Sequence, residues 1–252
     1  MIEEDKKEII MLAIYKREMR GYFTTWTGYI FLAVSICLSA FILSLSTLLN
    51  ATSELSGYFA IIVYGMVVFL PILTMKSFSE ERKLKTEQLL MTAPISSWQM
   101  VLGKHLSAIT MLGIYLVSTL VFYIPLFDYA VVDTVNGYGP NVALMFGNMF
   151  AMFLIGACFI AVGIFISSLT ENQFASIVLT MVVLLAFLLI GSFNSLIENE
   201  SVRVVFDWFS IYSRYQYFTY GVFDISALFY YISVSGVFVF LTTRVFEARR
   251  YN

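Results

Sequence analysis

Residues with chemical potential are concentrated in one polar stretch, residues 76–105, which holds five Lys or Arg and three Glu. Within it, Gly103-Lys104 superficially resembles a phosphate-binding loop. No Gly stands five residues earlier, however, and His105 occupies the place of the required Ser or Thr. The sequence also has no HExxH motif and no convincing nucleophile–base pair. We therefore predict no catalytic residue, metal or cofactor in this chain, and a source of energy outside it.

The same polar stretch carries clear helix punctuation. Lys85 to Thr92 read as a short helix, because Thr86 can cap its first turn, Glu87 suits that turn, and Pro94 ends it. A new helix is expected directly afterwards, since Ser96 and Gln99 have capping-box spacing. Ile95 and Met100 are placed as its hydrophobic staple. A short helix held between two long membrane helices is well placed for another protein to push on.

Composition makes the rest of the chain a membrane protein. Of 252 residues, 60% are hydrophobic and 13% are charged, whereas soluble domains have about 25% charged residues. Six charge-free runs, each long enough for one crossing, occupy residues 21–53, 55–75, 106–127, 134–170, 172–197 and 225–243. We predict an all-α polytopic protein with six transmembrane helices in a single domain, residues 1–252. No charged residue is expected well inside a span, and Cys37 and Cys158 are expected to be small buried hydrophobic residues.

The expected helices cover residues 28–49, 55–75, 96–127, 142–166, 173–193 and 225–243. Pro71 stands where a kink would redirect the chain into the polar stretch, and Thr170 can cap the fifth helix. With both termini cytoplasmic, the inner segments hold 13 of the 15 Lys and Arg, leaving only Arg203 and Arg214 outside. The positive-inside rule therefore predicts this orientation.

Two further amphipathic segments flank the spans. Residues 6–23 are expected to form an interfacial helix with Lys16, Arg17 and Arg20 towards anionic headgroups, while Ile10 and Ile14 fall outside the apolar face and could contact protein. Residues 194–224 are rich in aromatic side chains and too polar to span, which predicts an outer interfacial or re-entrant helix. Its apolar face is expected to meet either lipid headgroups or a central cleft. In the second case it would form an outer gate, made by the side chains of Trp208, Tyr212, Tyr215 and Phe218.

Taken together, this order of segments resembles the membrane subunit of type-2 ABC exporters over essentially the whole chain. The local matches are Lys85-Thr86-Glu87-Gln88-Leu89-Leu90-Met91-Thr92-Ala93-Pro94-Ile95-Ser96 and Ser167-Ser168-Leu169-Thr170-Glu171-Asn172-Gln173. Three more motifs are similar to the branch of gliding-motility-associated permeases: Arg20-Gly21-Tyr22-Phe23, residues 212–218 and Gly221-Val222-Phe223-Asp224. Gliding itself does not follow, because the branch occurs widely in bacteria that do not glide.

The resemblance implies a permease dimer, from two identical or homologous chains, in a bacterial cytoplasmic membrane. Two separate ATP-binding-cassette subunits would bind ATP and Mg²⁺, and no nucleic acid is involved. The residues expected to contact the ATPases are Lys85, Thr86, Glu87, Gln88, Leu89, Leu90, Pro94, Thr170, Glu171 and Asn172. The alternative is a membrane anchor that uses ATPase strokes mechanically without moving a solute.

Overall fold

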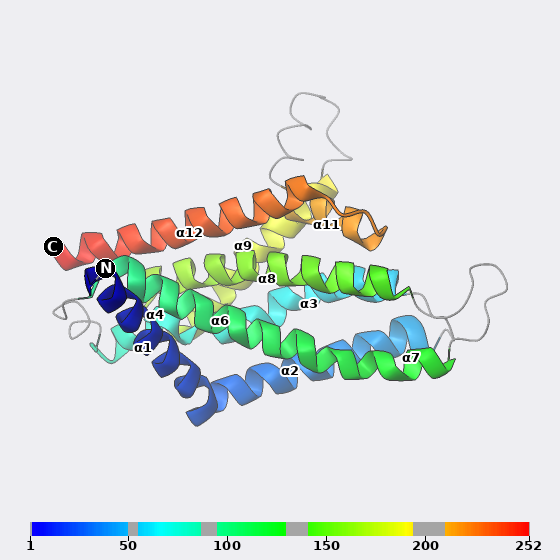
Figure 1. Ribbon diagram of the computed structural model, residues 1–252, viewed down its shortest axis with the longest axis horizontal. Helices are drawn as coiled ribbons and strands as arrows, with labels where there is room; N and C mark the ends of the chain where they lie inside the picture. Colours follow the sequence, from blue (N-terminus) through cyan, green and yellow to red (C-terminus); the bar gives the residue numbers. More distant parts are fainter. Residues whose placement is uncertain (1, 50–54, 87–94, 130–140, 194–209, 252) are drawn as a thin grey trace, which may run out of the picture.

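The computed structural model describes residues 2–49, 55–86, 95–129, 141–193 and 210–251, and it is entirely helical over these residues (Figure 1). In chain order the elements are α1 (Ile2–Thr24), α2 (Trp26–Leu43), η1 (Ser44–Leu48), α3 (Ser56–Thr74), α4 (Lys76–Lys83), α6 (Ser97–Thr119), η2 (Leu120–Tyr123), α7 (Ile124–Tyr129), α8 (Val142–Leu169), α9 (Gln173–Phe193), α11 (Ile211–Thr219) and α12 (Ile225–Tyr251).

Six helical stretches of the described chain are long and apolar enough to cross a membrane, which confirms the predicted span count. They are Trp26–Leu48, Ser56–Lys83, Ser97–Phe127, Val142–Leu169, Gln173–Ile190 and Ile225–Arg250. The last helix does not end at residue 243 as expected but continues to Tyr251, because Arg and Glu support a helix and no Gly or Pro follows. Both chain ends and the residues flanking 87–94 lie at one end of the bundle, here the terminal end, and α7 and α11 lie at the other, the far end (Figure 1).

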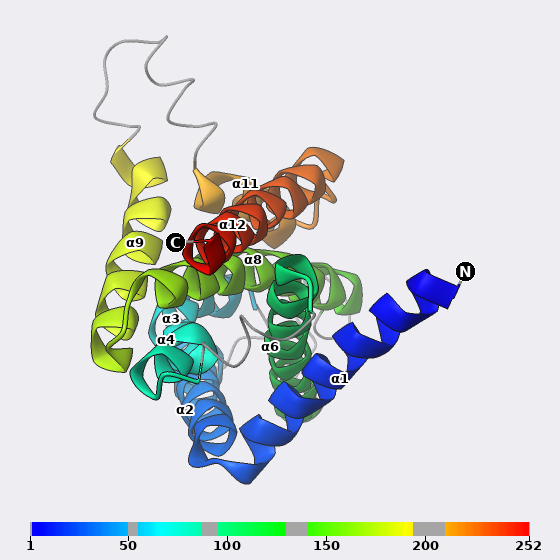
Figure 2. The ribbon, with the colours of Figure 1, turned by 90° about the vertical axis from the view of Figure 1, so that its left-hand side faces the viewer.

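The central element is α8, which contacts α3, α4, α6, α9, α11 and α12 (Figure 2). Small residues allow two of these contacts to be close. A Cβ added to Gly163 would lie 2.3 Å from Thr74 Oγ1, and one added to Gly156 would lie 2.5 Å from a methyl carbon of Leu112. Helices in a membrane gain attraction by such close approach, so α8 forms the hub on which α3 and α6 are fixed. Cys158 on α8 is buried as predicted, but Cys37 on α2 is exposed in this single chain.

The N-terminal helix packs along α6 and does not lie apart from the bundle (Figure 2). Ile14 is buried there, and its Cγ2 would lie 3.0 Å from a Cβ added to Gly103. Tyr22 is buried too, while Leu12 and Phe23 are exposed. The expectation that part of this helix contacts protein is therefore confirmed, and its predicted apolar face is divided between the bundle and the surroundings.

The third span changes geometry near its far end because of a proline. Pro125 has no N–H with which to reach the carbonyl of Val121 four residues earlier. The N–H of Ile124 donates to that carbonyl instead, and Leu120–Tyr123 form a turn of 3₁₀-helix. The carbonyl of Val121 therefore keeps a backbone hydrogen bond despite the proline.

Candidate functional site

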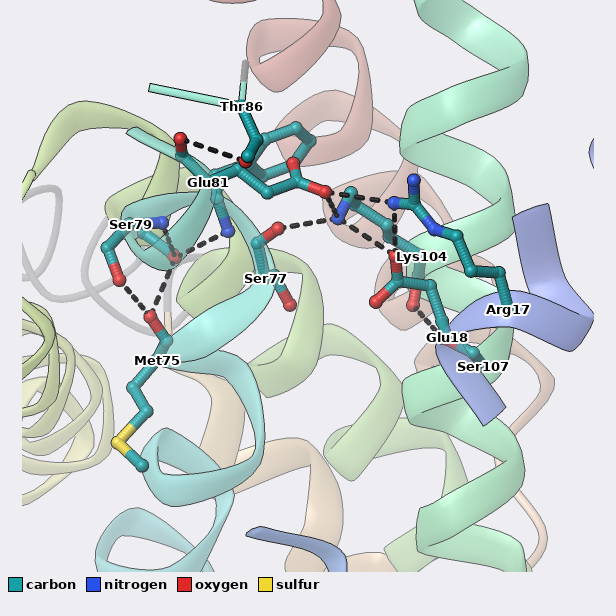
Figure 3. A network of polar contacts seen from close by, with 11 residues as sticks. Arg17, Glu18, Met75, Ser77, Ser79, Glu81, Thr86, Lys104 and Ser107 are labelled. Atoms are coloured by element: carbon teal, nitrogen blue, oxygen red, sulfur yellow. Dashed lines mark hydrogen bonds and ion pairs between the residues drawn. The ribbon is translucent and has the colours of Figure 1, made fainter. Parts of the chain in front are cut away.

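Lys104 on α6 is the centre of a buried ionic network at the terminal end (Figure 3). Its ammonium donates to Glu18 Oε1 on α1 at 3.1 Å, to Glu81 Oε1 on α4 at 2.9 Å and to the carbonyl of Ser77 at 2.7 Å. All three ammonium hydrogens thus have an acceptor, and the side chain is only 2% exposed. Because a buried cation separated from its partners is very unfavourable, the network fixes α1 and α4 to α6.

Arg17 balances the charge of this network. Its guanidinium donates to Glu18 Oε1 at 2.7 Å and to Glu81 Oε1 at 2.9 Å, so two cations face two carboxylates. Burial alone would raise the pKa of Glu18, but the charges of Lys104 and Arg17 outweigh it and hold that pKa below its ordinary value. Glu18 is therefore ionised at neutral pH.

The three bases expected at the membrane surface thus divide into two kinds. Lys16 and Arg20 are exposed on α1, where they are free of the bundle core. Arg17 is half-exposed but is turned into the ionic network. We therefore assign Arg17 to the protein network and only the other two to the surface of α1.

A cavity of about 250 Å³ adjoins the network. Its lining includes Glu18, Tyr22, Lys76, Glu80, Glu81, Thr86 and Lys104. Glu81 Oε2 is buried beside it and has no hydrogen-bond partner within the described residues. The cavity is large enough for water, so this oxygen can accept a hydrogen bond from water or from a donor that moves towards it.

Ser167 of α8 inserts into the break between α3 and α4. Its Oγ accepts from the backbone N–H groups of Phe78 and Ser79, at 3.1 and 3.2 Å, and donates to the carbonyl of Met75 at 3.1 Å. Pro71 lies one turn earlier, inside α3, which continues as an α-helix through it to Thr74. The inserted hydroxyl, which accepts two backbone N–H groups, explains why the helix breaks a turn beyond the proline where the sequence predicted a kink.

Arg82, near the end of α4, joins this helix to the turn between α8 and α9. Its guanidinium donates to Glu171 Oε1 at 2.6 Å and to the carbonyl of Leu169 at 3.1 Å. The sequence indicated two separate polar segments at this end of the bundle. The structure brings them together into one surface.

The turn itself differs from the prediction in one detail. Asn172, and not Thr170, caps the fifth span, because Asn172 Oδ1 accepts from the N–H of Phe174 at 3.0 Å. The hydroxyl of Thr170 instead donates to the carbonyl of Ile166 in the preceding helix, at 3.2 Å. Asn172 directly precedes Gln173, the first residue of α9, whereas Thr170 lies three residues before it, so Asn172 is the one placed to cap this helix.

Residues 86–95, here the connecting segment, leave α4 through a left-handed residue. Lys85 has φ 56°, a conformation that ends a helix, and its N–H donates to the carbonyl of Arg82 at 3.0 Å. Thr86 donates to the carbonyl of Glu81 at 3.3 Å. The other residues expected to contact a partner here lie outside the described residues: Glu87, Gln88, Leu89, Leu90 and Pro94.

The other end of the connecting segment is held by α6 and α12. The N–H of Ser96 donates to Gln99 Oε1 at 3.3 Å, which is the predicted Gln99 half of the capping box. Arg250, at the end of α12, donates to the carbonyl of Ile95 at 3.0 Å. The last helix of the chain therefore contacts the segment that lies between the second and third spans.

At the far end, α11 packs on α3, α8 and α9 of the same chain. Tyr215 and Phe218 are buried, and the hydroxyl of Tyr215 donates to the carbonyl of Phe59 at 3.1 Å. Tyr212 is half-buried, with its ring 5.1 Å from that of Tyr64. The apolar face thus meets the protein core, which is neither of the two expected environments. Trp208 lies outside the described residues.

Sequence reasoning missed the buried charges. Nothing in the sequence indicated that Lys104, in the first turns of Ser97–Phe127, is buried. The next residue, His105, is also buried, and its Nε2 lies 3.2 Å from Ser235 Oγ on α12. Both follow the predicted helix cap at Ser96 and lie on the third span as expected, but their burial depends on packing against other helices. Among the described residues, no group of three His, Cys, Asp or Glu could hold a metal ion.

A family model described as ABC-2 family transporter protein matches residues 66–246, most of the chain. No curated protein matches the chain. The matched region begins within α3 and ends within α12, so it contains both ends of the connecting segment and the break at Ser167.

Proposed function

Because the chain belongs to the ABC-2 family of transporter membrane proteins, we propose that it is the permease subunit of an ATP-driven exporter. It forms the translocation pathway as a dimer with a second copy or a homologue. The family implies ATP-binding-cassette ATPases as partners, and a permease of this family has no ATPase site of its own. ATP and Mg²⁺ bind to those ATPases. This chain contributes the residues that contact the ATPases and the pathway through the membrane.

The observation that carries the proposal is how the connecting segment is held. On one side, Arg82 joins its base to the turn at Glu171, and Glu81 joins it to Lys104 on α6. On the other side, Arg250 of α12 holds the carbonyl of Ile95. A force applied to this segment therefore reaches α4, α6, α8 and α12 through direct polar contacts.

The ionic network makes several of these helices move as one body. Losing one partner of a buried ion pair costs about 3–5 kcal/mol, which is of the order of the free energy that drives a conformational change. Lys104 therefore remains paired with Glu18 and Glu81 during a stroke, and α1, α4 and α6 shift together. The break at Ser167 lets α4 change its angle to α3 without opening the rest of the span.

The contacts with the ATPase are assigned to the segment and to the adjoining turn. Lys85, Thr86 and the residues up to Pro94 enter a groove on the ATPase, and Thr170, Glu171 and Asn172 form the second contact. The support is that Arg82 holds the base of the segment and the turn together. The bacterial cytoplasmic membrane is the proposed location, with the terminal end in the cytoplasm, since that end has 13 of the 15 Lys and Arg.

The outer end is proposed to be closed by α11. Tyr212, Tyr215 and Phe218 seal the pathway by holding α11 against α3, and the bond from Tyr215 to the carbonyl of Phe59 supports this. Trp208 is proposed as a fourth member of the gate from the sequence alone. Aromatic rings suit such a seal because each buries a large area with no charge to desolvate. Membership of the gliding-motility-associated branch is also proposed, from the motifs at residues 20–23, 212–218 and 221–224.

The test is reconstitution with the ATPase that co-purifies with the tagged chain. The double substitution of Glu87 by Ala and Leu90 by Lys should abolish co-purification, or leave an ATPase whose activity no longer responds to the permease. A control substitution outside the proposed contact, Glu247 to Ala on α12, should do neither. Unchanged assembly of the first variant would refute the coupling site. Absence of any substrate-stimulated ATPase activity in liposomes would favour the mechanical anchor.

A further inference from the structure

A long groove runs along the far half of α12, between this helix, α9 and α11. Its volume is about 700 Å³. Its lining is almost entirely apolar and aromatic, with the following members: Phe187, Ile211, Arg214, Ser226, Phe229, Tyr230, Ser233, Val234, Val237 and Phe238. None of the contacts described above uses this groove.

The groove has the length of one membrane leaflet. Along α12 it extends from Ser226, at the far end, to Phe238, which at about 1.5 Å per residue is roughly 18 Å. Half of the hydrocarbon thickness of a bilayer is about 15 Å. At the deep end, the rings of Phe187 and Phe238 lie 6.3 Å apart and form a floor. The groove therefore begins at headgroup level and ends near the bilayer centre.

A cation stands at its shallow end. The guanidinium of Arg214 on α11 lies 4.3 Å from the ring centroid of Tyr230, and both line the groove. Stacking on a ring fixes the plane of a guanidinium, and a planar guanidinium is well suited to bind phosphate. The nearby carboxylate of Asp224 accepts the N–H of Ser226 at 2.9 Å, in the first turn of α12.

A second groove shows what an ordinary lipid-facing hollow on this protein looks like. It lies on α6 and α8, has a volume of about 610 Å³ and is lined by Ile109, Thr110, Gly113, Ile114, Val117, Ser118 and Phe153. Its size and apolar character are similar, but its lining includes no charged side chain. The charge at headgroup depth is what distinguishes the α9–α12 groove.

We propose that the α9–α12 groove binds a phospholipid by its headgroup phosphate, taken from the leaflet at the far end. One acyl chain lies against Phe229, Val234 and Val237, and the phosphate binds Arg214. The length, the apolar wall and the single cation at the shallow end are complementary to such a lipid. The bound lipid fills the space between α9 and α12 and links both helices to α11.

Native mass spectrometry of the full chain from nanodiscs with equal amounts of phosphatidylglycerol and phosphatidylethanolamine tests this proposal. The parent protein should retain both lipids, since both have the phosphate. Arg214→Gln should lower retention of both about tenfold, because it removes a charge-assisted hydrogen bond. Its control is Arg244→Gln, at the terminal end of α12, where the guanidinium also lies over a ring, 5.0 Å from the centroid of Phe240. This control should keep the parent retention.

A second pair of variants fills the two grooves. Val237→Trp should lower retention of both lipids, whereas Val117→Trp, which is also exposed, in the α6–α8 groove, should have no effect. This pair lies on the surface and decides the matter even if Arg214→Gln proves unstable by thermal unfolding. Parent-like retention in Val237→Trp would overturn the proposal. A change of oligomeric state in that variant, with lipid retention unchanged, would also overturn it and identify a second copy of the chain as the occupant.

Discussion

Arg82 and Glu171 form an ion pair of 2.6 Å although 89 residues separate them in the sequence. Arg82 stands on α4, where the connecting segment leaves the bundle, and Glu171 lies in the turn between α8 and α9. The contact makes one continuous surface of the two polar segments expected to meet an ATPase. A partner that binds this surface therefore acts on the second, fourth and fifth spans together.

Substitution of Glu171 by Gln should affect coupling more than stability. The carboxylate is 72% exposed, so loss of the pair should change the free energy of unfolding by less than about 1 kcal/mol. The ratio of solute transported to ATP hydrolysed in proteoliposomes should fall, since the turn no longer follows α4. Glu247→Gln is the control, because its partner Arg244 is on the same helix. A parent-like ratio in Glu171→Gln would mean that the turn is not part of the coupling surface.

Lys104→Met should destabilise the protein strongly. It removes the buried cation between Glu18 and Glu81 and leaves them only the half-exposed Arg17, at a cost of about 3–5 kcal/mol. The control is Lys76→Met, whose pair with Glu80 is longer, at 3.9 Å, and partly exposed, and which should cost less than about 1 kcal/mol. Thermal unfolding in detergent measures both. Equal shifts of the unfolding temperature in the two variants would show that the buried network stabilises the protein no more than an exposed ion pair does.

The pKa of Glu18 predicts how stability depends on pH. Since the folded-state pKa is lowered, the network contributes its full stability above the unfolded pKa of about 4.3 and loses it as the pH falls through the folded value. Glu18→Gln should therefore lose less stability than the parent protein between neutral pH and acid. Glu80→Gln, next to the network, should keep the parent dependence. Unfolding midpoints over this pH range provide the measurement, and identical curves for Glu18→Gln and the parent would contradict the assignment.

Ser167→Ala should weaken the junction of α3 and α4. It removes the acceptor for the N–H groups of Phe78 and Ser79 in a buried site, which should cost about 1–3 kcal/mol. Ser168→Ala is matched in burial, but that hydroxyl only donates to the carbonyl of Phe165 within its own helix, so its loss should cost less. Hydrogen exchange at Phe78 and Ser79 should rise in the first variant alone. Protected amides there would show that the hydroxyl is not needed to hold the break.

The spans were predictable because they depend on local properties. Hydropathy acts within a few turns of the chain, and the fourth span begins at Val142, where the sequence places it. The Asn141 side chain accepts from the N–H groups of Ala143 and Leu144, at 3.1 and 3.2 Å. Such features need no knowledge of how the helices pack.

The network and the break were not predictable, since both depend on packing between distant segments. Lys104 meets Glu18 from 86 residues away, and Ser167 meets Phe78 from 89 residues away. In the sequence, this lysine is one of several charges in the polar stretch 76–105, at the start of the predicted helix 96–127, and this serine is one small residue among many in an apolar run. The environment of α11 was mistaken for the same reason: the buried position of Tyr215 is set by the carbonyl of Phe59 on α3.

The outer seal can be tested without unfolding the bundle. Replacing Tyr212, Tyr215 and Phe218 together by Ala would open a large cavity, because Tyr215 and Phe218 are buried and each such truncation costs about 3–5 kcal/mol. Tyr215→Phe is gentler: it keeps the ring and removes only the bond to the carbonyl of Phe59, at about 1 kcal/mol.

If α11 closes the outer end, this loss should shift the balance towards an open state about fivefold, and basal ATPase activity of the reconstituted complex should rise with it. Tyr217→Phe, on the exposed side of the same helix, should leave that activity unchanged. Membrane insertion and thermal unfolding of both variants establish that the fold is intact. Basal activity equal to the parent in a folded Tyr215→Phe would mean that α11 only anchors the far end of the bundle and gates nothing.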